Sequence, residues 1–192
     1  MKKIISVIFF IVGMGHFAKS QTIKPTLGIN FTDVVSNVDG TASGRTGWQI
    51  GATVIFGDKI YVEPGIFYQN KSADFSSSNN LIQPDLKADL KGIRVPLAFG
   101  YNLIGNSESK VSFRLFGGPS GFFVTDTSDD ININNINSPA WGLFAGAGLD
   151  IWFLFVDVSY EWSVTDIQTS FTNIEFGKTN GLFANAGIRI RL

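Results

Sequence analysis

The chain has 192 residues, of which 44% are hydrophobic and 16% charged, and it contains 18 Phe, 21 Gly and no Cys. This apolar, aromatic composition excludes a disordered or collagen-like chain, and the lack of Cys excludes disulfides, thiolate metal sites and cysteine nucleophiles. The formal net charge is −1, and no run of basic residues indicates nucleic-acid binding.

The first 20 residues have the pattern of an export signal. Lys2-Lys3 is basic, Ile4–Gly15 is apolar, and Ala18-Lys19-Ser20 places small residues where a signal peptidase cleaves. The apolar run is shorter than the roughly 20 residues that a spanning helix needs. We therefore expect a signal peptide over residues 1–20, cleavage between Ser20 and Gln21, and a mature domain of residues 21–192 in a Gram-negative envelope.

The mature chain alternates apolar and polar residues with a period of two, which predicts strands and no helix. Three predicted connections are short, and the four others are long and rich in Asn, Asp, Ser and Thr. Alternating short and long connections are typical of an eight-stranded antiparallel up-and-down barrel whose long loops share one end. The expected strands are Thr22–Asp33, Arg45–Phe56, Ile60–Lys71, Asp89–Leu103, Lys110–Thr125, Pro139–Trp152, Leu154–Ile167 and Thr179–Leu192.

One face of the predicted strands is nearly free of charge, and the other mixes small residues with charges of both signs. Alternation alone leaves open whether the apolar face points outward, as in a membrane barrel, or inward, as in a soluble calycin-like carrier of an apolar ligand. Gly, Ala and Ser on the second face suit the crowded interior of eight strands. The apolar stripes cover about 9–11 residues, the length needed to cross a bilayer. Both observations favour a transmembrane barrel.

Aromatic residues lie on the apolar face near both ends of the predicted strands. Such rings are typical of lipid headgroup boundaries, so we expect a girdle that contacts outer-membrane lipid. Its predicted members are Trp48, Phe56, Tyr68, Tyr101, Trp141 and Trp162.

Eight charged residues on the second face would lie inside the barrel and would have to pair, because an unpaired buried charge costs several kcal/mol. We expect Glu63 and Arg94, on neighbouring strands, to meet. Eight strands leave room only for side chains, which favours a filled interior over a pore. The expected interior charges are Glu63, Arg94, Arg114, Asp150, Asp157, Glu161, Arg189 and Arg191.

Four segments follow one another in a specific order: Tyr61–Tyr68, Ile93–Tyr101, and the glycine-rich Phe116–Gly121 and Gly142–Leu149. Together they resemble the outer-membrane β-barrel domain of Bacteroidota, which includes PorT-like proteins, and barrels of the OmpA and OmpX type. The resemblance implies an eight-stranded outer-membrane barrel, mostly without assigned activity, with some members linked to protein secretion. Leu192 departs from the terminal aromatic residue usual in such barrels.

Little in the sequence indicates catalysis. The only His is His16, inside the expected signal peptide, so the mature chain lacks the usual base of a nucleophilic triad. We expect neither an enzyme nor a cofactor. A weak candidate for Ca²⁺ binding is Asp126, Asp129 and Asp130, although a solvated acidic loop explains these residues more simply.

These patterns predict a monomeric, non-enzymatic barrel that contacts outer-membrane lipid. Its four long loops would give it a structural role or bind an extracellular or envelope protein. Two alternatives stay open: a small channel or component of a secretion machinery, and the soluble calycin-like carrier.

Overall fold

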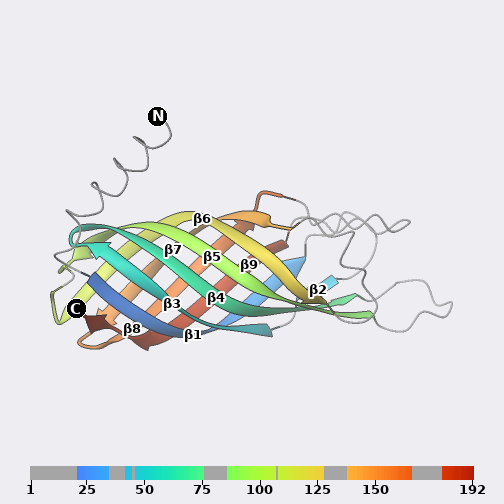
Figure 1. Ribbon diagram of the computed structural model, residues 1–192, viewed down its shortest axis with the longest axis horizontal. Helices are drawn as coiled ribbons and strands as arrows, with labels where there is room; N and C mark the ends of the chain where they lie inside the picture. The colour runs from blue at the N-terminus through green and yellow to red at the C-terminus, as the bar shows by residue number, and fades with distance from the viewer. Residues whose placement is uncertain are drawn as a thin grey trace, which may run out of the picture.

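The computed structural model describes residues 21–34, 42–44, 46–75, 86–106, 108–127, 138–165 and 179–192. They form one antiparallel sheet, which Figure 1 shows as a barrel of tilted strands. The strands are β1 (Gln21–Val34), β2 (Ala42–Gly44), β3 (Thr46–Gly57), β4 (Ile60–Phe75), β5 (Leu86–Ile104), β6 (Val111–Thr127), β7 (Ala140–Ile151), β8 (Leu154–Ser163), β9 (Thr179–Ile188) and β10 (Ile190–Arg191).

The sheet closes on itself, which confirms the predicted eight-stranded barrel. From β3 to β9 each long strand pairs with the next in sequence, and β9 pairs with β1. β9 and β10 are two parts of the last strand, interrupted at Arg189, and both pair with β1. β2 is a short addition that pairs with the outer end of β4. Closure lets every strand satisfy its backbone hydrogen bonds without a free edge, as a bilayer requires.

The three short connections lie at one end of the barrel, as expected, and the C-terminus lies there too (Figure 1). Gly57 and Gly105 begin two of these turns with φ of 121° and 72°, a region that favours glycine. The Leu192 amide donates to the Gln21 carbonyl at 3.0 Å, which ties the chain end to β1. We call this end the turn side and the opposite end the loop side. The described part of the chain contains no helix long and apolar enough to cross a membrane.

The hairpin of β4 and β5 is longer than predicted. The expected strands stop at Lys71 and begin again at Asp89, but pairing continues to Phe75 opposite Leu86. The polar residues of this segment suggested a loop. Outside a bilayer, paired strands do not need an apolar face. The hairpin therefore extends past Trp48, the last residue of β3 that pairs with β4. β2, which joins this extension, was not predicted.

Apolar side chains cover the outside of the barrel, and polar and charged side chains fill its lumen together with several aromatic rings. Leu27, Ile66, Leu143 and Val156 are each at least half exposed. The buried polar residues include Lys24 and seven of the eight predicted interior charges, together with Thr, Ser, Asn and Gln. A soluble carrier would need an apolar lumen, so the described structure rules out the calycin-like alternative.

Candidate functional site

Most of the lumen's charges form one network near the turn side. Arg114, on β6, is 1% exposed and contacts three carboxylates at once. Its Nη1 lies 3.0 Å from Glu63 Oε2, its Nη2 contacts Asp157 Oδ1, and its Nε lies 3.3 Å from Asp150 Oδ1. These carboxylates come from β4, β8 and β7, so one guanidinium connects four strands across the barrel.

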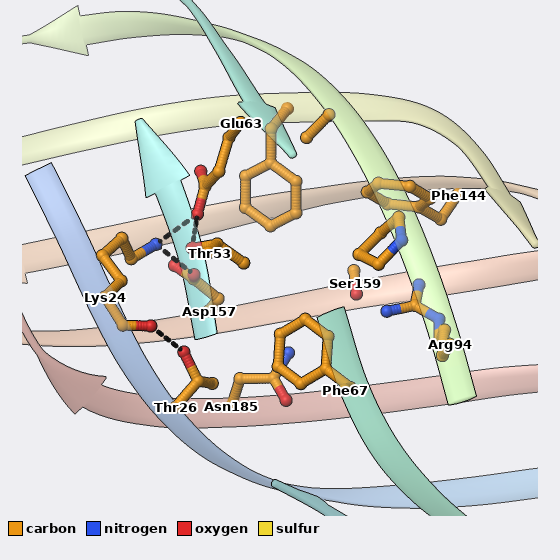
Figure 2. Close-up of a pocket in the computed structure, with 13 residues that line it drawn as sticks. Lys24, Thr26, Thr53, Glu63, Phe67, Arg94, Phe144, Asp157, Ser159 and Asn185 are labelled. Atoms are coloured by element: carbon orange, nitrogen blue, oxygen red, sulfur yellow. Dashed lines mark hydrogen bonds and ion pairs between the residues drawn. The ribbon is translucent and has the colours of Figure 1, made fainter. Parts of the chain in front are cut away.

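Lys24 joins the same network from β1 (Figure 2). Its ammonium lies 2.9 Å from both Glu63 Oε1 and Asp157 Oδ2, and 4.0 Å from the centroid of the Phe155 ring. The Thr53 hydroxyl donates to Glu63 at 2.6 Å, so each oxygen of this carboxylate has a partner. Such multiple contacts are what a charge needs in order to be held in a low-dielectric interior.

Arg189 completes what we call the turn-side network. Its Nη1 lies 3.2 Å from Asp150 Oδ2, which also accepts a 2.6 Å hydrogen bond from the Ser112 hydroxyl. The network thus contains three cations and three carboxylates among the described residues, and these charges balance. Its members are Lys24, Glu63, Arg114, Asp150, Asp157 and Arg189.

A second ion pair lies toward the loop side. Arg94, on β5, donates to Glu161 Oε2 from Nη2 at 2.6 Å and from Nε at 2.9 Å, and Ser120 donates to the same oxygen at 2.8 Å. The guanidinium lies between aromatic rings, 4.6 Å from the centroid of Phe183 and 5.2 Å from that of Phe144. We call Arg94 and Glu161 the loop-side pair.

Glycines make room for these large side chains. A Cβ on Gly148 would lie 2.2 Å from Asp157 Oδ1 and 2.9 Å from Arg114 Nε. A Cβ on Gly100 would lie 2.1 Å from the Tyr61 ring, whose hydroxyl accepts a hydrogen bond from Arg114 at 3.3 Å. The small residues that the sequence places on the inner face are therefore the space into which the charged side chains pack.

A cavity of about 40 Å³ separates the network from the pair. Figure 2 shows Lys24, Glu63 and Asp157 on one side of it and Arg94 with Phe144 on the other. This volume holds a few water molecules at most. The described part of the lumen is thus filled by side chains, and a continuous pore would require both sets of ion pairs to separate.

The expected pairing of Glu63 with Arg94 is wrong. Glu63 lies opposite Ala98, and Arg94 lies opposite Phe67, so the two charges are four residues apart along the sheet. At 3.3 Å per residue this offset is about 13 Å. Each residue finds its partners on strands across the barrel instead.

Lys24 was not predicted to lie inside the barrel but is buried there, and Arg191 was predicted to lie inside but is exposed. Lys24 alternates with Thr22 and Thr26 on the inner face of β1, a signal that could have identified it. Arg191 is exposed, because it lies beyond Arg189 at the rim of the barrel. It reaches across this rim and donates to the carbonyls of Glu108 and Ser109 at 2.9 Å.

A family model for the outer membrane protein β-barrel domain matches residues 17–169. The chain belongs to this family. Several solved structures share its fold, and none of the curated proteins compared with it matches. The outer membrane protein OprG from Pseudomonas aeruginosa is 17% identical, with a TM-score of 0.53 over 88% of this chain and 93% of OprG. Ail, the attachment invasion locus protein of Yersinia pestis, in complex with the heparin analogue sucrose octasulfate, is 16% identical, with a TM-score of 0.50 over 88% of this chain and 99% of Ail.

The outside of this outer-membrane barrel carries the aromatic residues singled out from the sequence. Trp48, Tyr68, Trp141 and Trp162 are between 41% and 50% exposed on the loop side. On the turn side Tyr101 is exposed and Phe56 is half-buried. Trp152 and Phe153 form the last short turn, and their rings stack edge to face with centroids 4.8 Å apart. Neither was predicted as a member of the girdle, and Trp152 was assigned to the end of the strand Pro139–Trp152.

The residues of the weak Ca²⁺ candidate are only partly described. Asp126, at the outer end of β6, lies 3.5 Å from Lys91 Nζ, with both side chains largely exposed. Asp129 and Asp130 lie outside the described residues, as does the expected signal peptide over residues 1–20. Within the described ranges, no three acidic or His side chains gather as metal ligands would.

Proposed function

We propose that this outer-membrane protein is a closed, non-enzymatic barrel that holds its four long connections at the cell surface. There they serve a structural role or bind an envelope or extracellular protein. The observation that carries the proposal is the filled lumen. Both sets of ion pairs block the space between the barrel ends, and the cavity between them is only about 40 Å³.

The contacts that the charged side chains of the lumen make with one another support a non-catalytic role. A general acid or base needs a group that is free to exchange a proton with a substrate. The buried carboxylates Glu63, Asp157 and Glu161 each accept contacts from cations and hydroxyls or other donors. The sequence after His16 contains no further His. These groups are arranged as a packed core.

The extended hairpin of β4 and β5 supports the surface role. The hairpin continues for five residue pairs past the point where β3 stops pairing with β4. These pairs run from Lys71 opposite Leu90 to Phe75 opposite Leu86. At 3.3 Å per residue they form a stalk of about 17 Å. β2 broadens this stalk, which would hold the connection between β4 and β5 away from the lipid surface.

We propose that residues 1–20 are removed on export, that the barrel is a monomer, and that it belongs to the PorT-like group of Bacteroidota. The segments Tyr61–Tyr68 and Ile93–Tyr101 support the last point by their resemblance to that group. A link to secretion would be tested by deleting the gene and comparing the secreted proteins with those of the parent strain.

Conductance in a planar bilayer tests the filled lumen. The wild-type barrel is expected to give no discrete conductance steps, and its folded state is verified by a shift in gel migration between boiled and unboiled samples. An Arg114→Ala variant, which empties the centre of the network, is the matched comparison. Reproducible steps from the folded wild type would overturn the proposal and support the small-channel alternative.

A further inference from the structure

Two glutamines in the loop-side half of the lumen hold amide groups without partners. Gln69, on β4, is 0% exposed, and neither its amide oxygen nor its amide nitrogen has a hydrogen-bond partner. Gln49, its cross-strand neighbour on β3, is 1% exposed. Gln49 donates to Asn185 at 2.6 Å, but its own oxygen has no partner. Buried amides are almost always hydrogen-bonded, so these groups indicate a polar occupant.

Lys71 lies in the same part of the lumen. It follows Gln69 by two residues and so shares the inner face of β4. Its ammonium lies 4.6 Å from the centroid of the Phe122 ring. The Phe122 ring lies over Gly92, since a Cβ added to Gly92 would be 2.7 Å from Phe122 Cζ. Gly92 is the cross-strand partner of Gln69. One aromatic ring therefore lies beside both the Lys71 ammonium and Gly92, the residue directly opposite Gln69.

The charges around this place do not balance. Glu161 and Arg94 lie within electrostatic range of Lys71, which gives two cations and one carboxylate among the described side chains. Glu161 Oε2 is already held by two nitrogens of Arg94 and the Ser120 hydroxyl. In a low-dielectric interior a surplus cation attracts an anion more strongly than it would in water. Lys71 is half-buried, so a small ion can reach it.

We propose that the loop-side half of the lumen binds a small oxyanion, with Lys71 supplying the charge and Gln69 an amide donor. Among the described side chains the cations outnumber the carboxylates, which disfavours a metal cation. The N–H donors of both residues match the acceptor oxygens of phosphate or sulfate. The site lies above the loop-side pair and is distinct from the turn-side network. It would give the barrel a ligand inside its outer mouth, in addition to whatever its loops contact.

The test is a titration of the folded, detergent-solubilised barrel with inorganic phosphate at constant ionic strength. The side-chain amide signals of Gln69 are followed by NMR, and the affinity is measured by calorimetry. Saturable binding that shifts the Gln69 signals is expected. Lys71→Met should weaken it at least about tenfold, because a charge-assisted hydrogen bond is lost, and Lys71→Arg should retain it.

Lys91→Met is the matched control. Lys91 lies opposite Asn70 at the same height of the barrel but points outward, toward Asp126. The Lys91→Met variant should therefore bind phosphate as the wild type does. Gln69→Leu, which keeps the side chain's size and removes its donors, should also weaken binding if it folds. Absence of saturable binding to the wild type, or equal affinity in Lys71→Met, would overturn the proposal and leave ordered water as the occupant of the amides.

Discussion

Replacing Arg114 with Met tests whether the turn-side network stabilises the barrel as a unit. Arg114 lies between Glu63, Asp150 and Asp157, and it is 1% exposed. Removing it leaves three carboxylates facing two cations, so one negative charge has no compensation. Met fills most of the vacated volume, which restricts the effect to the charge and its hydrogen bonds.

Breaking a buried ion pair by removing one partner costs about 3–5 kcal/mol. We expect Arg114→Met to lower the free energy of unfolding by that amount. Adding Asp157→Asn restores the balance of charges and should recover part of the loss, since coupled neighbours show interaction energies of about 0.5–3 kcal/mol. The double variant is therefore expected to be more stable than Arg114→Met alone.

The assay is urea-induced unfolding of the barrel in lipid vesicles, followed by tryptophan fluorescence and extrapolated linearly to water. Lys91→Met is the control, because the Lys91–Asp126 pair is 3.5 Å long and its side chains are 44% and 61% exposed. Exposed pairs contribute about 0–1 kcal/mol. If Arg114→Met lost no more stability than this control, the reasoning from a balanced, buried network would be refuted.

Two further substitutions test packing and pairing. Gly148→Ala places a methyl group 2.2 Å from an oxygen of Asp157 and should lower the free energy of unfolding by about 1–3 kcal/mol in the same urea assay. Gly121→Ala, whose methyl group would have its nearest neighbour at 3.4 Å, should leave this free energy nearly unchanged. Equal stability of the two variants would contradict the packing argument. The losses in unfolding free energy caused by Arg94→Ala and Glu63→Gln should add to within about 0.5 kcal/mol in the double variant, because the two residues have separate partners. A larger coupling energy would support the direct Glu63–Arg94 pair expected from the sequence.

The turn-side network links the arrangement of the lumen to the register of four strands. Buried ion pairs are often replaceable by apolar residues without loss, because desolvation offsets their attraction. In this barrel, however, Arg114 must meet carboxylates from three other strands. A shift of one residue in any strand would turn its side chain to the lipid face. The network therefore selects the observed register over shifted alternatives.

The sequence by itself determined the eight long strands to within a few residues, which of their faces is apolar, and the positions of the short turns. These follow from local rules: alternation with a period of two shows which residues share a face, and turn residues such as Gly57 and Gly105 mark where the chain reverses. The charged residues of the inner face were found by the same rule. Lys24 obeys it as well and was identified only in the structure.

Tertiary structure alone decided which charges meet. Neighbouring strands suggested Glu63 with Arg94, but register places these residues four positions apart. Closure of the barrel brings Lys24 and Arg114 to Glu63 instead, and both cations also contact Asp157. Register and the stagger of a closed sheet are properties of the whole barrel and leave no trace in any single strand. The position of the Phe122 ring, beside the Lys71 ammonium and over the residue opposite Gln69, depends on the same geometry. Alternation therefore predicts which face Gln69 and Lys71 share but not what lies next to them.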